Sequence, residues 1–316
     1  MDPKIVFIGG TPRGLALIKA LLKEKAQVVY SFITQEDDHE PFKVSGEIVD
    51  ICKANKIPYQ LTKRIIKDDL SRLQNFEPDV GFVCGWRTMI SKEFYNSIPL
   101  GCFACHDSIL PQYRGFAPTA WAIINGEKQT GVTLFKIDDG EADSGDIFRQ
   151  KIIPIDDRQT ASDIYPQIVE QSVQLYIEYL QELKKRDVTL MKQDHSQATY
   201  GARRTPDDGK IDWSKNTVDV FNFIRALTPP YPYAWTDYHG EKIFIKKASL
   251  PKADFDYPKI HETGKILSVS GHGAAMTCGD GVILIQEIIK GSGETYPANK
   301  FFYLDSGHPV NKGKAL

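Results

Sequence analysis

Two side chains in this sequence have the types needed to move a proton and to orient the group that moves it. His106 carries an imidazole, which ordinarily titrates near neutral pH and can both accept and donate a proton during a reaction. Asp143 offers a carboxylate, and a carboxylate beside an imidazole holds the ring in one orientation and stabilises its charged form. Because the two residues lie far apart in the sequence, their use as a pair depends on the fold.

Both residues belong to segments of distinctive composition. The segments are His106-x-Ser108-x-Leu110-Pro111-x-Tyr113-Arg114-Gly115, Pro118-x-x-Trp121-Ala122-Ile123-x-Asn125-Gly126-Glu127, Thr130-Gly131-Val132-Thr133 and Asp143-x-Gly145-x-Ile147. Together they resemble the signature of formyltetrahydrofolate-dependent formyltransferases. Two later segments, Arg204-Thr205-Pro206-Asp207-Asp208-Gly209 and Cys278-Gly279-Asp280-Gly281, are similar to the C-terminal barrel of methionyl-tRNA and nucleotide-sugar formyltransferases. The resemblance therefore spans nearly the whole chain.

The resemblance implies transfer of a formyl group from N10-formyltetrahydrofolate to an amine, with His106 as acid and base, Asp143 as its partner and no metal ion. It also implies which residues line the folate. They are Thr88, Met89, Ile90, Leu110 and the loop Asp139-Gly140-Glu141-Ala142-Asp143. The alternative for that loop is an acidic, solvated turn.

Ala104 departs from the family pattern, which has an asparagine two residues before the histidine. A side-chain amide there would donate a hydrogen bond to the developing oxyanion, and loss of one such donor costs roughly 100- to 1000-fold in turnover. Three explanations remain open. The residue was substituted to trap a complex, another donor such as a backbone N–H or protonated His106 suffices, or the protein binds ligands without efficient turnover.

The elements that must position these residues follow from the hydrophobic pattern. Apolar runs at 4–8, 27–33 and 80–85 indicate strands, and helical spacing follows the first two. This alternation predicts an α/β fold, a Rossmann-like, mostly parallel sheet with helices on both faces. A long helix is expected at 161–185, and short strands separated by glycines in the C-terminal part predict a small, OB-like β-barrel.

We expect the catalytic domain at residues 1–200 and the barrel-like domain at residues 201–316, with the polar stretch 193–208 as a linker. In such sheets ligands bind at the carboxyl ends of the strands. The glycine loop 9–14 does not match the dinucleotide motif, so it indicates either a tight turn or a substrate contact. The predicted substrate contacts are Gly10, Thr11, Pro12, Arg13, Tyr113, Arg114, Arg203, Arg204 and Tyr231. Tyr113 and Arg114 could instead fix their own loop.

The five cysteines form no even disulfide framework, and buried free thiols are the ordinary interpretation. Cys102-Phe103-Ala104-Cys105-His106 also fits the haem-attachment pattern and a redox C-x-x-C. Haem attachment requires export, and a redox pair favours a helix N-terminus. The segment instead has the composition of a buried strand, whose neighbouring side chains point to opposite faces.

The balance of basic and acidic side chains bears on which substrate the protein binds. The 316 residues carry 39 basic and 41 acidic side chains, and from residue 205 onward there are 13 of each, which disfavours a nucleic-acid substrate. We therefore expect a nucleotide-linked amino sugar, with methionyl-tRNA, or a non-catalytic folate- or nucleotide-binding module, as alternatives. No secretory signal or membrane-spanning stretch is evident, so the protein is expected in the cytoplasm. An exposed apolar or aromatic face in the C-terminal part could pair two chains as a homodimer.

Overall fold

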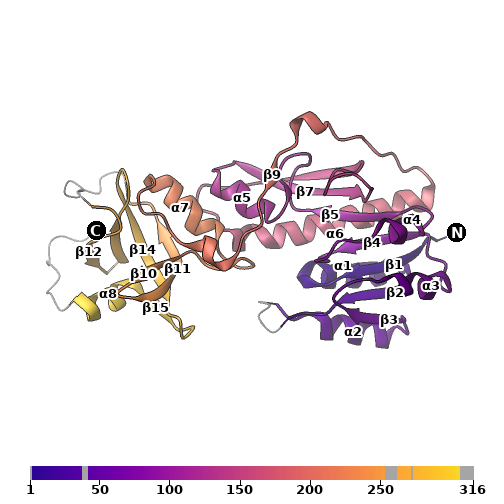
Figure 1. Cartoon of the computed structure of the whole chain (residues 1–316), viewed down its shortest axis with the longest axis horizontal. Coiled ribbons are helices and arrows are strands. Elements are labelled where there is room, and N and C mark those ends of the chain that lie inside the picture. The colour runs from indigo at the N-terminus through magenta and orange to yellow at the C-terminus, as the bar shows by residue number, and fades with distance from the viewer. Residues whose placement is uncertain (1, 38–41, 253–261, 272, 307–316) are drawn as a thin grey trace. The chain divides into compact units, whose positions relative to one another are not determined.

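The computed structural model describes residues 2–37, 42–252, 262–271 and 273–306 (Figure 1). Its contacts divide the chain into two compact units. The first comprises Met1–Pro118, Gln129–Pro154 and Tyr165–Ala202, and the second comprises Thr119–Lys128, Ile155–Ile164 and Arg203–Leu316. Among the described residues, no helix combines the length and apolarity that crossing a bilayer requires.

The first unit is built on a seven-stranded sheet in the order β3-β2-β1-β4-β5-β7-β8. The strands are β1 (Lys4–Gly9), β2 (Gln27–Thr34), β3 (Tyr59–Thr62), β4 (Val80–Cys84), β5 (Cys102–His106), β7 (Gln129–Lys136) and β8 (Ile147–Pro154). Strands β3 to β5 pair in parallel, whereas β7 and β8 add two antiparallel strands beside β5. The mostly parallel sheet expected from the sequence is thereby confirmed.

Helices cover both faces of this sheet. They are α1 (Thr11–Lys23), α2 (Ser45–Ala54), α3 (Lys67–Gln74), α4 (Lys92–Asn96) and α6 (Ala161–Lys185). On one face, Val83 of β4 belongs to an apolar cluster that includes Phe94 of α4. On the other face, the adjacent Phe82 lies 5.1 Å, ring centroid to centroid, from Tyr176 of α6. The alternation of side chains along β4 therefore assigns α4 and α6 to opposite faces.

Helix α6 has the bounds predicted from the sequence, and local signals explain both ends. Thr160 and Asp163 form reciprocal hydrogen bonds at its start, with Asp163 Oδ2 accepting from the Thr160 N–H at 2.8 Å. Lys184 and Lys185 lie in its last turn, where positive charge interacts favourably with the helix dipole. Its buried Tyr176 hydroxyl donates to the carbonyl of Val83, which ties the helix to β4.

The polar stretch after α6 differs from our prediction of a linker. Its first part stays with the first unit and contains a 3-10 turn, η1 (His195–Gln197), and a short strand, β9 (Tyr200–Gly201). Strand β9 pairs in parallel with β6 (Arg114–Gly115). The linker prediction was wrong for residues 193–202, because backbone pairing with a distant loop outweighs the polar composition.

The second unit contains an antiparallel sheet in the order β10-β11-β14-β13-β12, with β15 also on β14. The elements are α5 (Pro118–Ile124, mostly in this unit), η2 (Pro206–Gly209), α7 (Thr217–Ala226), β10 (Trp235–Tyr238), β11 (Glu241–Ser249), β12 (Ile266–Ser270), β13 (Gly273–Thr277), β14 (Val282–Ile289), β15 (Thr295–Pro297) and α8 (Ala298–Ser306). Ile224 of α7 and Phe302 of α8 are buried in the same core as Ile285 of β14. The C-terminal domain of short strands expected from the sequence is confirmed as this antiparallel sheet.

Candidate active site

Strand β5 ends at His106, on the carboxyl edge of the sheet where the parallel strands β1 and β4 also end. The residue is buried, with 8 % of its surface exposed, and its backbone pairs with Thr133 of β7. Because alternate residues of a strand point to the same face, Ala104 and His106 share one face of β5 and Cys105 lies on the other. Ala104 packs against the α3 and α4 core, which assigns the site to that face.

The loop that follows His106 is held by polar side chains of β7 and β8. The Leu110 N–H donates to Thr133 Oγ1 at 3.1 Å, and the Leu110 carbonyl accepts from Gln150 Nε2 at 2.7 Å. Tyr113 then adopts a left-handed backbone conformation, with φ of 56°. The loop thereby returns to the histidine, and the Tyr113 carbonyl lies 2.7 Å from His106 Nε2.

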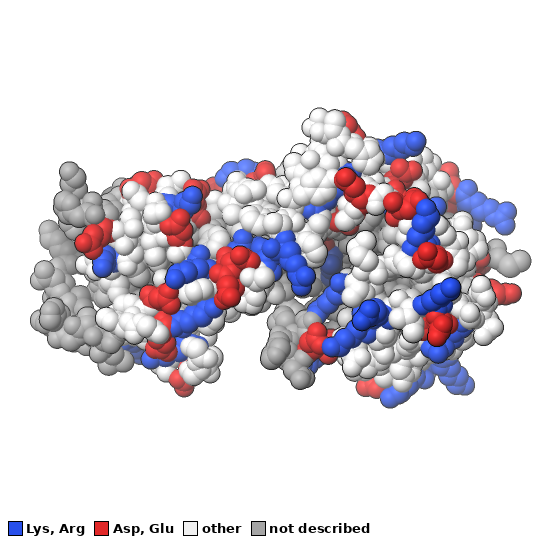
Figure 2. Space-filling model, in the orientation of Figure 1, with Lys and Arg blue, Asp and Glu red and all other residues white. Residues whose placement is uncertain are grey.

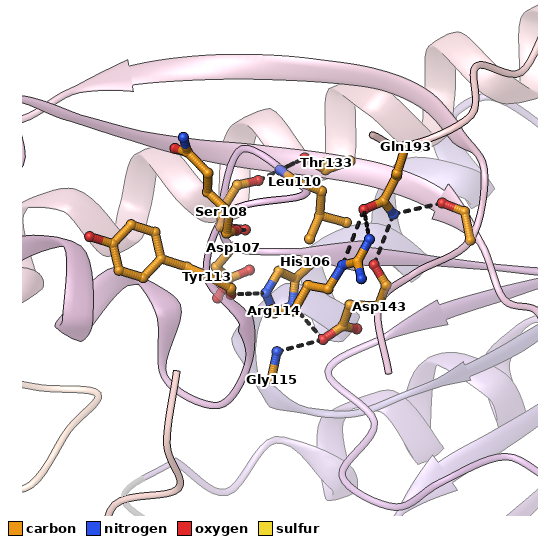
Figure 3. Close-up of polar contacts among 12 residues, drawn as sticks. His106, Asp107, Ser108, Leu110, Tyr113, Arg114, Gly115, Thr133, Asp143 and Gln193 are labelled. Carbon is orange, nitrogen blue, oxygen red and sulfur yellow. Dashed lines mark hydrogen bonds and ion pairs between the residues drawn. The ribbon is translucent and has the colours of Figure 1, made fainter. Parts of the chain in front are cut away.

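The second nitrogen of the same ring faces Asp143 (Figure 3). His106 Nδ1 lies 3.5 Å from Asp143 Oδ2, which also accepts a hydrogen bond from the Gly115 N–H at 2.9 Å. Both ring nitrogens therefore face oxygen atoms, and the carboxylate that faces one of them is fixed by a backbone amide. The structure brings together the two residues that the sequence analysis paired.

Asp143 is presented by a loop with unusual backbone geometry. Its φ of 59° falls in the left-handed region, which aspartate tolerates better than most residues. Two residues later, Gly145 approaches β7 so closely that a Cβ built on it would lie 1.8 Å from the Lys136 carbonyl oxygen. The position of Asp143 thus depends on a glycine at 145.

Replacement of Gly145 by alanine is expected to destabilise the protein by about 1–3 kcal/mol, because the loop and β7 must separate to admit the methyl group. Activity should fall with it, since the same shift moves Asp143. Thermal unfolding and steady-state assays measure both effects. Gly46→Ala is the matched control, because no atom lies within 4 Å of the Cβ that it adds and alanine favours a helix. Equal melting temperatures for the two variants would contradict the expectation.

Arg114, predicted as a substrate contact, is placed in the interior. Its side chain is 1 % exposed, and its Nε and Nη2 donate to Gln193 Oε1 at 3.2 and 2.7 Å. The remaining donors lie 3.0 Å from His195 Nδ1 and 3.2 Å from the Tyr200 hydroxyl. This position does not support substrate binding by the guanidinium, since its donors are already used within the protein. It supports the other interpretation, that Arg114 fixes its loop.

The glycine loop after β1 lies on the same edge of the sheet. Gly10 leaves little room for a side chain, because an added Cβ would lie 2.7 Å from Thr34 Oγ1. Pro12 and Arg13 lie in the first turn of α1, and Arg13 forms an ion pair with Asp107, the residue after His106. Burial lowers the pKa of Arg13, but the neighbouring groups, Asp107 foremost, together outweigh this effect and the net pKa is raised. Arg13 therefore stays charged and links this loop to the one that follows His106.

The segments predicted to hold the folate also meet. Met89 is 83 % exposed, whereas Ile90 is buried in the core beside α4. Lys92, at the start of α4, pairs with Asp139 of the acidic loop, and this hydrogen bond and charge lower the pKa of Asp139. The loop that follows β4 and the loop that carries Asp143 are thus joined by an ion pair.

The other predicted contacts with the folate and the substrate are distributed between the two units. Thr88 is exposed and its hydroxyl donates to the Lys63 carbonyl at 3.3 Å. Leu110 is buried against Phe135 and Ile147. The second unit contains Arg203, Arg204 and Tyr231. There, Arg204 stacks over Trp121, with 5.0 Å between its Cζ and the ring centroid, and Tyr231 packs against the core of that unit.

Gln193 was missed by the sequence analysis. It is 6 % exposed, and its amide nitrogen donates to the carbonyls of Asp143 and Gly145 at 2.8 and 2.7 Å. It lies in a polar stretch without periodicity, so no local pattern marks it as buried. Met191, two residues earlier, pairs with Ile147 at the start of β8.

The C-x-x-C segment lies within β5, with its two thiols on opposite faces. Cys102 belongs to the α3 and α4 core, whereas Cys105 Sγ lies 3.3 Å from Ser172 Oγ of α6. Burial raises the pKa of both thiols well above its ordinary value. A redox pair requires adjacent thiols, one of them with a lowered pKa, so this geometry favours buried structural cysteines.

The chain combines an α/β unit with an antiparallel β unit. The α/β unit carries a histidine and a carboxylate at the carboxyl edge of its sheet, and this combination indicates a class of two-domain transferases. Residues 3–180 match the formyl transferase family, and residues 203–304 match the formyl transferase C-terminal domain. The chain belongs to the formyl transferase family.

The relatives and solved structures agree with this assignment. A methionyl-tRNA formyltransferase of Acetivibrio thermocellus is 30 % identical and covers 99 % of both chains, and one of Desulfotalea psychrophila is 31 % identical over 90 % of this chain and 87 % of its own. An N-formyltransferase from Helicobacter canadensis, solved with folinic acid and dTDP-3-aminofucose, matches with a TM-score of 0.68 and 21 % identity over 94 % of this chain and 100 % of its own. HypX from Aquifex aeolicus, solved with tetrahydrofolic acid, gives a TM-score of 0.68 and 16 % identity over 97 % of this chain and 48 % of its own. The chain thus spans about half of HypX, and likeness at these identities concerns the fold.

Proposed function

We propose that the protein transfers the formyl group of N10-formyltetrahydrofolate to a primary amine, with His106 as acid and base and Asp143 as the group that orients it. The observation that carries the proposal is the placement of the His106 ring between the Tyr113 carbonyl at 2.7 Å and the Asp143 carboxylate at 3.5 Å. A hydrogen bond to a carbonyl assigns a proton to Nε2. Nδ1 is then the nitrogen that gains and loses a proton, and Asp143 stabilises it when charged.

The residues perform the proton transfers that acyl transfer requires. The amine nitrogen attacks the formyl carbon, and its proton passes to His106 as the new carbon–nitrogen bond forms. The bond from the formyl carbon to folate N10 then breaks, and His106 returns the proton to N10. The donor supplies the formyl group and leaves as tetrahydrofolate. The donor is expected to bind between the segments 88–90 and 139–143. They fit this role because the second contains Asp143, and its Asp139 pairs with Lys92, which lies just after the first.

For the acceptor we propose an amino sugar carried on a nucleotide. A nucleic-acid substrate calls for unpaired positive charge, whereas several described lysines of the second unit form ion pairs. Lys210 Nζ lies 2.6 Å from Asp237 and Lys246 Nζ lies 3.1 Å from Glu287. On the face shown in Figure 2, basic and acidic side chains are interspersed. The Helicobacter canadensis neighbour, which covers 94 % of this chain, was solved with a nucleotide-linked amino sugar.

Methionyl-tRNA is the second candidate acceptor, and the sequence relatives favour it. Methionyl-tRNA formyltransferases match nearly the whole chain at 27–31 % identity, above the 21 % of the sugar enzyme. The balanced charge of the second unit favours the nucleotide-linked amino sugar, whereas identity to tRNA formyltransferases along nearly the whole chain favours methionyl-tRNA. The two therefore have to be separated by assay.

The deciding experiment follows release of tetrahydrofolate after the protein is mixed with N10-formyltetrahydrofolate and either a panel of nucleotide-linked amino sugars or methionyl-tRNA. We expect release with at least one sugar and little with the tRNA. Release with methionyl-tRNA alone would replace the proposed acceptor and leave the chemistry intact. Folate binding without release for every amine would instead support a non-catalytic binding module.

A further inference from the structure

The stretch after α6 contacts both loops of the active site, and we call residues 191–201 the clasp. At its start, Met191 pairs with Ile147, the first residue after the Asp143 loop, through N–H···O bonds of 2.7 and 2.8 Å. At its end, the Thr199 carbonyl accepts from the Arg114 N–H at 2.8 Å, and Thr199 Oγ1 accepts from the Tyr113 N–H at 2.8 Å. The clasp therefore connects the loop that carries Asp143 to the loop that folds back on His106.

Gln193 is the point of the clasp at which these connections converge (Figure 3). Its Nε2 has two protons, and it donates one each to the carbonyls of Asp143 and Gly145, at 2.8 and 2.7 Å. Its Oε1 accepts both donors of the Arg114 fork, at 3.2 and 2.7 Å. One buried amide thus satisfies two carbonyls of one loop and a guanidinium of the other.

We infer that Gln193 is a positioning residue that holds the Asp143 carboxylate against His106 by fixing the carbonyls on either side of Ser144. The inference rests on the proposed function of this pair. Asp143 has a left-handed backbone, a conformation that persists when surrounding contacts determine it. The hydrogen bonds of Gln193 to the Asp143 and Gly145 carbonyls are such contacts, and they fix the direction in which the carboxylate points.

The contacts of Arg114 support the same role. Besides Gln193, its guanidinium lies 3.0 Å from His195 Nδ1 and 3.2 Å from the Tyr200 hydroxyl, both in the clasp. Glu141 of the acidic loop lies 3.8 Å from Arg114 Nη1. A charge with 1 % exposure and several acceptors is a rigid anchor, and it orients the amide of Gln193 so that Nε2 faces the Asp143 loop.

The test compares Gln193→Glu with the wild-type protein. Glutamate keeps the size of glutamine and its contact with Arg114, but it replaces the nitrogen that carries the two donors with one carboxylate oxygen that faces the carbonyls of Asp143 and Gly145. We expect kcat to fall about 10- to 100-fold, the size that follows when a catalytic group is misplaced by about 1 Å, with KM for the donor changed less than threefold. Gln159→Leu is the control, because this glutamine lies in the second unit and accepts a hydrogen bond from the Asp156 N–H.

A double-mutant cycle distinguishes positioning from general damage. If Gln193 acts through Asp143, then Gln193→Glu should cause no further loss in an Asp143→Ala background. An equal loss in both backgrounds, or an unchanged kcat in the single variant, would overturn the inference. Thermal unfolding of each variant verifies that the fold is retained.

A measurement independent of activity keeps this inference separate from the proposed function. The Gly115 N–H donates to Asp143 Oδ2 at 2.9 Å, so its hydrogen exchange reports where the carboxylate lies. We expect faster exchange at Gly115 in Gln193→Glu, and the same rate as wild type in Gln159→Leu. If the wild-type protein formylates no amine, the proposed function fails, and exchange at Gly115 still decides whether Gln193 positions Asp143. Unchanged exchange at Gly115 would refute that role.

Discussion

Replacement of His106 by asparagine should lower the rate of formyl transfer by about 10²- to 10⁴-fold, the usual contribution of one positioned acid–base group. Asparagine occupies less space than histidine and cannot take up a proton at neutral pH. The donor should still bind, because the Lys92–Asp139 ion pair that joins its predicted segments does not involve the imidazole. Steady-state rates together with the dissociation constant of the donor would separate the two effects.

His239→Asn is the matched control for this substitution. His239 is exposed in the second unit and has φ of 49°, a backbone region in which asparagine is well tolerated. Its rate should remain within twofold of wild type. A loss of less than about tenfold in His106→Asn would mean that proton transfer by this side chain is not what limits the reaction.

Ala104→Asn should raise the rate by about 100- to 1000-fold, the amount that one oxyanion donor commonly contributes. Ala104 and His106 are alternate residues of β5, so an amide at 104 would emerge on the same face as the imidazole. The donor dissociation constant should change little, because the new hydrogen bond strengthens only as charge develops on the formyl oxygen.

Ala104→Leu separates the hydrogen bond from the added bulk, since leucine and asparagine are similar in size. Ala104 packs against Leu110, Phe135 and Ile147, so leucine fits the apolar character of the position but gives no donor. Its rate should not exceed that of wild type. A rate in Ala104→Asn that equals or falls below wild type would show that another group already stabilises the oxyanion.

Local signals were enough to predict much of the fold. Helix α6 was expected with its observed bounds from its apolar residues and the basic residues at its end, and the structure adds the cap that Thr160 and Asp163 form at its start. The strands β1, β2 and β4 follow from their apolar runs. The direction of β7 and β8 and the transfer of residues 119–128 and 155–164 to the second unit depend on long-range pairing, which periodicity does not encode.

The candidate site also has parts that the sequence could predict and parts that depend on long-range contacts. His106 and Asp143 could be selected from motif and chemistry, and the structure brings them together at 3.5 Å. Arg114 was predicted to contact substrate, with fixing its own loop as the alternative. Its burial depends on Gln193, a residue that is distant in the sequence and lies in a polar segment. The acceptors of one guanidinium cannot be inferred from its neighbours along the chain.

The clasp has a consequence for where the catalytic unit ends. The family match to the first domain stops at residue 180 and helix α6 ends at Lys185, yet Thr199 and Gly201 still accept hydrogen bonds from the backbone of residues 113–116. A fragment cut after α6 would retain His106 and Asp143 and lose every acceptor that Gln193, His195 and Tyr200 offer to Arg114. A piece of this protein that is meant to keep the contacts of these loops therefore has to extend at least to Gly201.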